Sequence, residues 1–366
     1  MAFRYYKQFE AMSDEEVSRG LREKAQAAKR KALERVEPID LSRTTWPQFP
    51  HPDVVAAVTF AMRRGVNSYA DPQARALRAE LGRRHGLEPE RIAVGNGAAE
   101  LLETLAAELL ELGDELVTPW PSYPLYPLLA RRAGAQAVPV PGRDHDALLA
   151  AITGRTRLLV LCNPNDPTGA YTPAAELDEL IRGLPERVVV CLDQALIDFV
   201  EAESPSASLA LLDEHPRLIV LRTFSKIHGL AGMRCGYALG GPGSEPLMER
   251  LAPALGVGAL AQAGALEALR KTQRQIDGRR ELVAAQRGRL LDALAELPVD
   301  VEPSQANLVW LTAPGLEGAE LAARLQRLGV MVRAGQAFGA TDHVRAAIHS
   351  PEGVDRLLRA LGTALD

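Results

Sequence analysis

Polar side chains follow three apolar runs of this sequence, at the points where the runs end. Asn163 to Gly169 come after the first run, Asp193 closes the second, and Thr223 to Lys226 come after the third. In open parallel sheets, ligands bind beyond the carboxyl ends of the strands, so these residues are candidates for one shared site. The sequence therefore predicts that the Asp193 carboxylate and the Lys226 amine lie at one sheet edge, either in a site or as a surface ion pair.

A glycine-rich turn supplies a candidate phosphate site. Residues 95–100, with the sequence GNGAAE, follow an apolar run and open a helical pattern. Free backbone amides at such a helix start suit an anion, and an arginine and hydroxyl groups would complete the site. The candidate ligands of the anion are Gly97, Ala98, Ala99, Thr223, Ser225 and Arg234.

A phosphate site, a lysine and a carboxylate together match the needs of pyridoxal 5'-phosphate. Lys226 would form the Schiff base with its aldehyde, and Asp193 would keep the pyridine nitrogen protonated so that the ring can draw electrons. We therefore expect this group as the cofactor. No metal is expected, because the seven histidines show no metal-ligand spacing.

The composition is that of an ordinary globular protein. The chain has 366 residues, of which 47% are hydrophobic and 24% charged, which suits two or three domains. Its 42 Lys and Arg against 47 Asp and Glu give a net charge of −5, which argues against a nucleic-acid partner. Three cysteines without paired spacing fit neither disulfides nor zinc, and the first residues show no signal peptide. We expect a cytoplasmic enzyme of small molecules with no membrane partner.

The apolar runs that must position these residues are mostly continuous rather than alternating. This is typical of strands covered by helices on both faces, and it predicts an α/β fold with a mainly parallel sheet of seven strands. Strands are expected at 91–94, 115–118, 135–140, 157–162, 188–192, 218–221 and 235–239, a long helical stretch at 246–295, and further strands at 307–311 and 331–333.

The same pattern predicts three segments. Residues 1–52 are expected to form an N-terminal helical arm and connector, in which 14–37 show helical spacing with a narrow apolar face. That face is expected to pack on a partner subunit or on the small domain. Residues 53–245 are expected to form the large cofactor-binding domain, and 246–366 an interdomain helix and a smaller α+β domain.

The sequence resembles the fold type I, class I and II aminotransferases, and within them the histidinol-phosphate aminotransferase-like group. The resemblance runs from about Leu41 to the C-terminus. Residues 223–236 (TFSKIHGLAGMRCG) are similar to the group's Schiff-base signature, and residues 163–169 (NPNDPTG) are similar to its NPxNPTG loop. Asp193, in LDQALIDF, stands where the family has its pyridinium aspartate.

The resemblance also implies roles for residues outside these motifs. Tyr123 matches the aromatic residue that stacks on the cofactor ring. Tyr69 matches a tyrosine that reaches the cofactor phosphate of the neighbouring subunit, which implies a homodimer with shared active sites. Arg345 matches the arginine that holds the substrate carboxylate or phosphate, and Arg333 and Asn307 match positions near the substrate.

The sequence departs from the family pattern at four places. Asp166 replaces the asparagine before Pro-Thr-Gly, and Leu196 replaces a tyrosine, so both usual hydrogen-bond donors to the phenolic oxygen of the cofactor are missing. Gln194 replaces a glutamate, and residues 43–47 (RTTWP) replace an Asn-Glu-Asn-Pro pocket segment.

The resemblance implies a transaminase that moves an amino group between an amino acid or amino phosphate and a 2-oxo acid. Lys226 would form the Schiff base and move the proton in each half-reaction. The altered pocket leaves two alternatives open. One is a decarboxylase, lyase or oxidative enzyme of specialised metabolism with the same cofactor, and the other is a non-catalytic binding protein.

Overall fold

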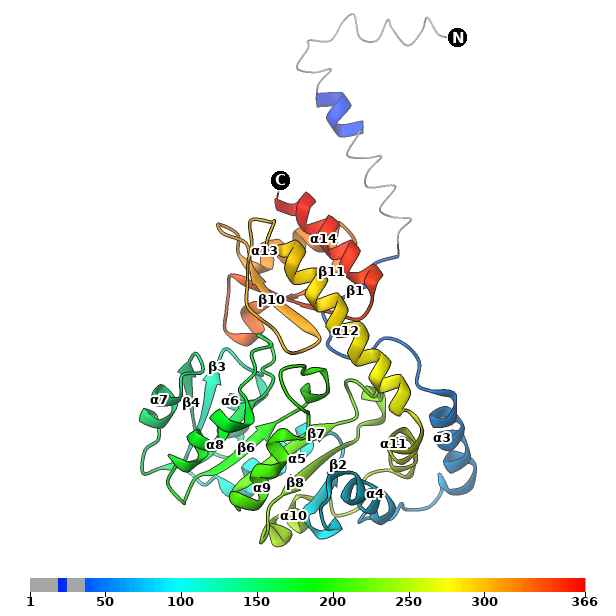
Figure 1. Cartoon of the computed structure of the whole chain (residues 1–366), viewed down its shortest axis with the longest axis vertical. Coiled ribbons are helices and arrows are strands. Elements are labelled where there is room, and N and C mark those ends of the chain that lie inside the picture. The colour runs from blue at the N-terminus through cyan, green and yellow to red at the C-terminus, as the bar shows by residue number, and fades with distance from the viewer. Residues whose placement is uncertain (1–18, 25–36, 366) are drawn as a thin grey trace, which may run out of the picture.

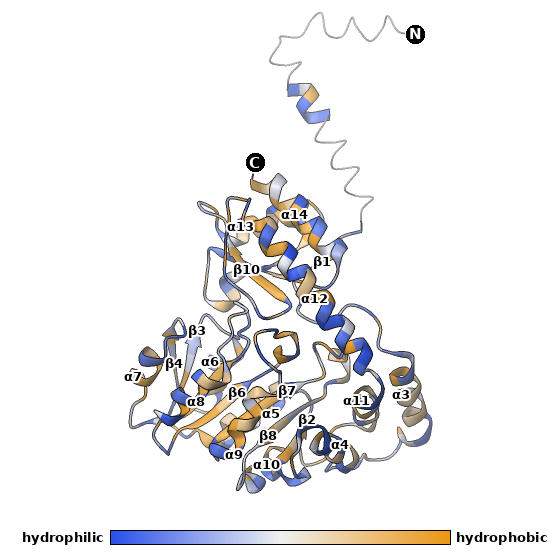
Figure 2. Ribbon diagram, in the orientation of Figure 1, coloured by the Kyte–Doolittle hydropathy of each residue, from blue (hydrophilic) through white to orange (hydrophobic). Residues whose placement is uncertain are grey.

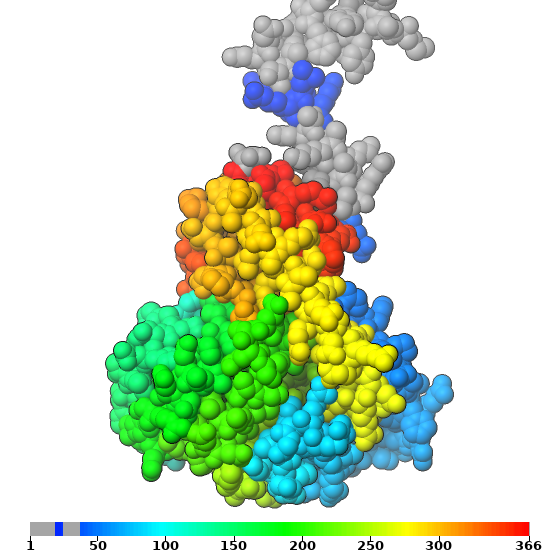
Figure 3. All heavy atoms as spheres, viewed as in Figure 1, coloured from blue at the N-terminus to red at the C-terminus, as the bar shows by residue number. Residues whose placement is uncertain are grey.

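The computed structural model describes residues 19–24 and 37–365. They form a larger part and a smaller part; orange residues of the smaller part lie next to the larger one, and the red C-terminal helix lies on the far side (Figure 1, Figure 3). Of the helix predicted over 14–37, residues 19–24 and 37 are described, and 19–24 are helical. The rest of that predicted helix lies outside the described residues.

The larger part is built on a seven-stranded sheet in the order β2-β8-β7-β6-β5-β3-β4. Neighbouring strands pair in parallel, except that β8 is antiparallel to both β2 and β7. This confirms the predicted α/β fold with a mainly parallel sheet. The strands are β2 (Ile92–Gly95), β3 (Glu115–Trp120), β4 (Gln136–Pro141), β5 (Thr156–Cys162), β6 (Val189–Asp193), β7 (Leu218–Thr223) and β8 (Gly236–Gly240).

Both faces of this sheet are buried, which explains the continuous apolar runs. Successive residues of a strand point to opposite faces. In β5, Leu158 and Val160 pack in one hydrophobic cluster, whereas Leu159 and Leu161 pack in another. Figure 2 shows the hydrophobic strands surrounded by helices of mixed hydropathy. The helices of this part are α3 (Pro52–Gly65), α4 (Arg75–His85), α5 (Ala98–Leu109), α6 (Leu125–Arg132), α7 (His145–Ala150), α8 (Ala174–Arg182), α9 (Leu211–Glu214), α10 (Glu245–Leu251) and α11 (Ala259–Lys271).

The smaller part holds an antiparallel sheet in the order β12-β13-β10-β9. A separate pair, β1 with β11, runs in parallel and ties residues 39–40 to this part. Its elements are β1 (Ile39–Asp40), α12 (Gln273–Leu294), β9 (Asp300–Val301), β10 (Leu308–Thr312), α13 (Gly318–Arg327), β11 (Val330–Met331), β12 (Arg333–Ala334), β13 (His343–Ala347) and α14 (Pro351–Leu365).

Residues 246–295, expected as one helical stretch, contain most of α10 and all of α11 and α12. The stretch breaks at 252–258, where Pro253 has no amide hydrogen and Gly256 adopts a φ of 72°. A Cβ on Gly256 would stand 2.5 Å from the Cα of Pro72, so the break brings two loops into contact. α11 packs against α3, and α12 runs from the larger part to α14 (Figure 1). Among the described residues, no helix has both the length and the hydropathy for crossing a membrane.

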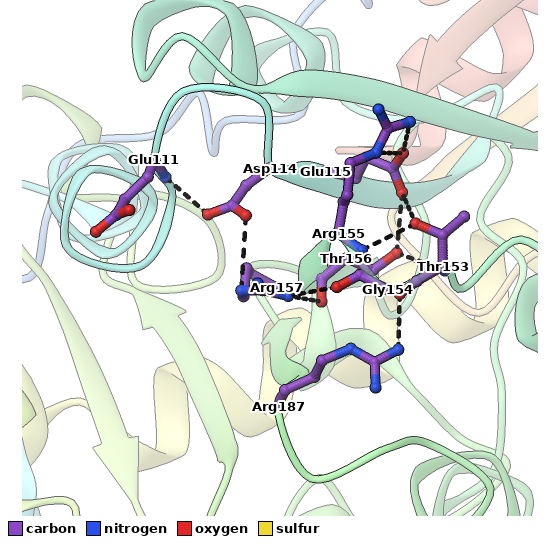
Figure 4. Close-up of polar contacts among 9 residues, drawn as sticks. All are labelled: Glu111, Asp114, Glu115, Thr153, Gly154, Arg155, Thr156, Arg157 and Arg187. Atoms are coloured by element: carbon purple, nitrogen blue, oxygen red, sulfur yellow. Dashed lines mark hydrogen bonds and ion pairs between the residues drawn. The ribbon is translucent and has the colours of Figure 1, made fainter.

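A polar network joins the amino ends of β3 and β5 (Figure 4). The buried Glu115 carboxylate accepts hydrogen bonds from the side chains of Thr153, Arg155 and Thr156. These hydrogen bonds, of which the one from Thr153 has the largest effect, hold the pKa of Glu115 below its usual value. The network thus anchors two parallel strands at the edge opposite to the one where their polar residues gather.

Candidate active site

The carboxyl ends of β5, β6 and β7 and the start of α5 surround a cavity of about 230 Å³. Each of these four segments contributes predicted site residues to the cavity, as expected for a ligand that binds beyond the carboxyl ends of parallel strands. The lining consists of Thr45, Ala98, Ala99, Leu102, Tyr123, Cys162, Asp166, Asp193, Ala195, Leu196, Thr223, Ser225, Lys226, Ala231 and Arg234.

Gly97 and Arg234 form a cradle for an anion at one end of the cavity. α5 begins after Gly97, whose φ of 91° and ψ of 160° are accessible to glycine alone. A Cβ on Gly97 would stand 2.3 Å from Nη2 of Arg234, so the guanidinium reaches the helix start only because this residue has no side chain. Arg234 also donates to the Asn96 carbonyl at 3.3 Å and to the Ser225 hydroxyl at 3.4 Å. Helix amides beside a guanidinium suit a phosphate.

Asp193 closes β6 between β5 and β7, and its carboxylate is buried. It accepts hydrogen bonds from the Tyr126 hydroxyl at 2.9 Å and from the Ala195 amide at 3.1 Å. Burial raises the pKa of Asp193, and the hydrogen bond from Tyr126 opposes that rise. A protonated pyridine nitrogen in the cavity would give this buried carboxylate a direct charge partner.

Lys226 follows β7, and its amine donates to the Thr44 hydroxyl at 2.5 Å. Burial lowers the pKa of Lys226, while the Asp166 carboxylate acts in the opposite direction. A lowered pKa favours the neutral amine, which is the form that attacks an aldehyde or accepts a proton. Within the described residues Lys226 and Asp193 take different partners, so the surface ion pair that the spacing left open is not formed.

Tyr123 forms a wall of the cavity and is 37% exposed. Its ring meets that of Tyr126 edge to face, with centroids 5.7 Å apart. Burial and the charge of Asp193 raise the pKa of Tyr123, so its hydroxyl stays protonated. Amine, buried carboxylate, aromatic wall and anion cradle face one cavity, and this set of groups fits pyridoxal phosphate.

Arg345 comes from β13, in the smaller part, and lies outside the cavity lining. Its Nη1 pairs with Oδ1 of Asp166 at 2.5 Å, and its Nη2 donates to the Ser42 carbonyl at 2.7 Å. Both side chains of the pair are nearly buried, with 9% of Arg345 and 12% of Asp166 exposed. The arginine expected to bind substrate is therefore already paired with a carboxylate of the protein.

The other predicted residues lie near Arg345 or far from the cavity. Arg333 lies opposite Arg345 in the register of β12 and β13, and its side chain is exposed. Asn307 is buried, and its amide donates to the Thr44 carbonyl at 3.1 Å. Tyr69, in the loop after α3, is 86% exposed and does not line the cavity of its own chain as far as the structure describes it. Its role at a neighbouring subunit stays a prediction.

Three residues that hydrogen-bond to predicted site residues were not themselves predicted to hold the cofactor or the substrate. These are Tyr126 beside Asp193, Thr44 beside Lys226, and Ser42, whose carbonyl binds Arg345. The spacing of Tyr126, three residues after Tyr123 at the start of α6, could have indicated a shared helix face. Thr44 lies in residues 43–47, which replace the family's pocket segment, but no spacing indicated its contact with Lys226. Ser42 carried no signal, because its partner lies far away in the sequence.

Comparison with protein families gives one match over most of the chain. The family described as "Aminotransferase class I and II" matches residues 36–361. An aromatic amino acid aminotransferase of Corynebacterium efficiens is 40% identical over 317 residues, which cover 85% of this chain and 89% of that protein. One of Mycobacteroides abscessus is 38% identical over 325 residues, with 88% and 91% covered.

Solved structures show the same likeness. The histidinol-phosphate aminotransferase of Sinorhizobium meliloti, in complex with pyridoxal-5'-phosphate, superposes with a TM-score of 0.80 at 27% identity and covers 93% of this chain and 94% of that one. The aspartate aminotransferase of Thermus thermophilus with maleate superposes with a TM-score of 0.79 at 28% identity, with 93% and 96% covered.

Proposed function

This chain belongs to the class I and II aminotransferases, and we propose that it binds pyridoxal phosphate and moves an amino group from an aromatic amino compound to a 2-oxo acid. The observation that carries this proposal is the convergence of Lys226, Asp193 and the Gly97–Arg234 cradle on one cavity. The similar aromatic amino acid aminotransferases support an aromatic side chain on the donor. They also support transamination over the decarboxylase, lyase, oxidative and non-catalytic alternatives.

Each group of the cavity has a task in this reaction. When bound, pyridoxal phosphate supplies an aldehyde that takes up the substrate amine and a ring that draws electrons from the reacting carbon. The cradle, with Thr223 and Ser225, would hold the phosphate, and Asp193 would hold a proton at the ring nitrogen. Tyr123 would pack against the ring. The Lys226 amine would remove the proton from the reacting carbon of the substrate.

A single-turnover experiment tests this function. The protein is loaded with pyridoxal phosphate, mixed with aromatic amines and amino acids, and the bound cofactor is followed by absorbance and identified after release. We expect pyridoxamine phosphate in stoichiometric amount, without CO₂. Lys226→Ala should abolish its formation, whereas Lys271→Ala, at the exposed end of α11, should leave it unchanged. Release of CO₂ or ammonia with recovery of pyridoxal phosphate would point to one of the alternatives instead.

We also propose that the active unit is a homodimer formed through a surface patch around α3. Its apolar side chains are exposed on α3, on the loop after it, and on the loop before α11. The two loops touch where Gly256 meets Pro72, so the patch extends across both loops. An exposed apolar patch of this kind marks an interaction site. Its residues are Val55, Phe60, Met62, Val66, Tyr69 and Leu255.

Light scattering of the purified full chain tests the dimer, with an expected mass of two chains. Phe60→Glu should shift the mass towards one chain, because a charge would be buried in the interface. Tyr69→Phe should keep the dimer and weaken pyridoxal phosphate binding. Leu112→Glu, at an exposed apolar residue between α5 and β3, serves as the control and should change neither. A single-chain mass for the unchanged protein would refute the dimer.

A further inference from the structure

The ion pair between Asp166 and Arg345 joins the two parts of the protein beside the cavity. Asp166 lines the cavity and follows β5, whereas Arg345 lies on β13 of the smaller part, 179 residues later. The distance from Oδ1 of Asp166 to Nη1 of Arg345 is 2.5 Å. The carboxylate of Asp166 thus occupies Nη1 of the arginine that the resemblance assigns to the acid group of the substrate.

The other groups of Arg345 are placed as follows among the described residues. Its Nη2 donates to the Ser42 carbonyl at 2.7 Å, and its guanidinium carbon lies 4.9 Å from the centre of the Phe338 ring. Nε is buried and has no hydrogen-bond partner among the described residues. A substrate carboxylate binds arginine best through two parallel N–H donors and a net positive charge. While Asp166 pairs with Nη1 and the Ser42 carbonyl accepts from Nη2, the charge of Arg345 is neutralised and these two nitrogens are not free as a pair.

Displacement of Asp166 by a substrate carboxylate is unfavourable. It would leave the Asp166 carboxylate nearly buried without its charge partner, beside a second acid group. Arg333, on the neighbouring strand, is exposed whereas Arg345 is buried, so Arg333 does not take the place of Arg345. A substrate without an acid group on its reacting carbon leaves the pair intact.

We propose that Asp166 is a specificity residue that keeps Arg345 in an internal ion pair, so that the preferred amino donor is a primary amine without a carboxylate on its reacting carbon. This inference rests on the proposed transamination and names its substrate class. The 2-oxo acid that accepts the amino group binds only by displacing Asp166 from Arg345, and therefore binds weakly.

The half-reaction with such an amine balances. The donor carbon loses its nitrogen and one hydrogen, gains the carbonyl oxygen and is oxidised by two electrons to an aldehyde. The aldehyde form of pyridoxal phosphate is reduced to its amine form and keeps the nitrogen.

Matched pairs of donors test the proposal on the cofactor-loaded full chain. Tyramine and tyrosine, and 2-phenylethylamine and phenylalanine, share a side chain and differ in the carboxylate. For the unchanged protein, the donor concentration that gives the half-maximal rate of pyridoxamine phosphate formation should be at least tenfold lower for each amine than for its matched amino acid. Asp166→Asn should lower this concentration at least tenfold for the amino acids and change it less than threefold for the amines. Asp213→Asn, at an exposed aspartate paired with Arg91, should change neither.

Binding of 3-phenylpropionate, an acid without an amine, gives a second readout that needs no turnover. Calorimetry should show at least tenfold tighter binding to Asp166→Asn than to the unchanged protein. The proposal is overturned if the unchanged protein binds the amino acids or this acid as tightly as Asp166→Asn does. If no donor yields pyridoxamine phosphate, the proposed transamination fails, and the calorimetric comparison alone then decides whether Asp166 occupies Arg345.

Discussion

The Lys226 amine donates a hydrogen bond to the Thr44 hydroxyl at 2.5 Å, although 182 residues separate the two side chains in the sequence. Thr44 is itself buried, and its carbonyl accepts from the Asn307 amide at 3.1 Å. It belongs to residues 43–47, the segment that departs from the family pattern. This altered segment therefore supplies a hydrogen-bond partner of the lysine at the centre of the site.

Thr44→Val should cost more free energy in the reaction barrier than in the free energy of unfolding. Loss of the hydroxyl leaves the Lys226 amine without its acceptor, so the amine is held less well for proton transfer. An increase of about 1.4 kcal/mol in the reaction barrier lowers the rate about tenfold. Single-turnover absorbance of the loaded protein measures this rate. Thr44→Ser keeps the hydroxyl and should retain most of it; equal rates for the Val and Ser variants would contradict a role for the hydrogen bond.

Gly97→Ala should weaken the binding of pyridoxal phosphate. The added Cβ would stand 2.3 Å from Nη2 of Arg234 and would require a φ near 91° from a residue with a side chain. The backbone strain alone costs about 1–3 kcal/mol. Cofactor affinity is measured by titration, and stability by urea unfolding.

Gly113→Ala separates strain from contact. Gly113 has a φ of 89°, and a Cβ there would meet nothing within 4 Å in the described chain. This variant should lose stability but keep its affinity for pyridoxal phosphate. If both variants bind the cofactor as well as the unchanged protein, the cradle is placed wrongly.

Tyr126→Phe should move the acidic limb of the pH–rate profile to higher pH. The Tyr126 hydroxyl donates to Asp193 at 2.9 Å and lowers the pKa of that carboxyl, against the larger effect of burial. Without this bond the pKa of Asp193 rises further, so the carboxylate is protonated at a higher pH as the solution is acidified. The rate of pyridoxamine phosphate formation between pH 5 and 9 checks this. An unmoved acidic limb would argue against Asp193 as the group that controls it.

His349 should contribute to a fall in the free energy of unfolding between pH 6.5 and pH 5. This side chain is 4% exposed, and burial lowers its pKa to about 4. The unfolded chain, in which a histidine titrates near pH 6.5, binds more protons in this window, so acidification favours unfolding. The loss attributable to this residue is about 2 kcal/mol at pH 5.

Urea unfolding at pH 7.5 and pH 5 measures that difference. His349→Gln should lose less stability on acidification than the unchanged protein, whereas His51→Gln, at a half-exposed histidine, should lose as much. Equal losses in the unchanged protein and in His349→Gln would contradict the prediction.

The sequence by itself determined the features that depend on neighbours along the chain. Continuous apolar runs such as 157–162 indicated strands buried on both faces. In such a strand every side chain is removed from water, whichever face of the sheet it points to. Gly97 before a helix and Lys226 after a strand indicated a cradle and an amine at one sheet edge, because parallel strands place their carboxyl ends together. The break at 252–258 was not predicted, because the helical pattern continues on both sides of Pro253.

Only the tertiary structure decided which side chains meet across distant elements. Asp166 follows a strand of one sheet and Arg345 lies on a strand of another, and 182 residues separate Thr44 from Lys226. Tyr126 reaches Asp193 from a helix beside the sheet. Such contacts depend on how helices pack on the sheet and on how the smaller part packs on the larger one, to within a few tenths of an ångström. Local spacing carries no information at that scale, so the sequence could place an arginine near the substrate and an aspartate near the cofactor, but not pair the two.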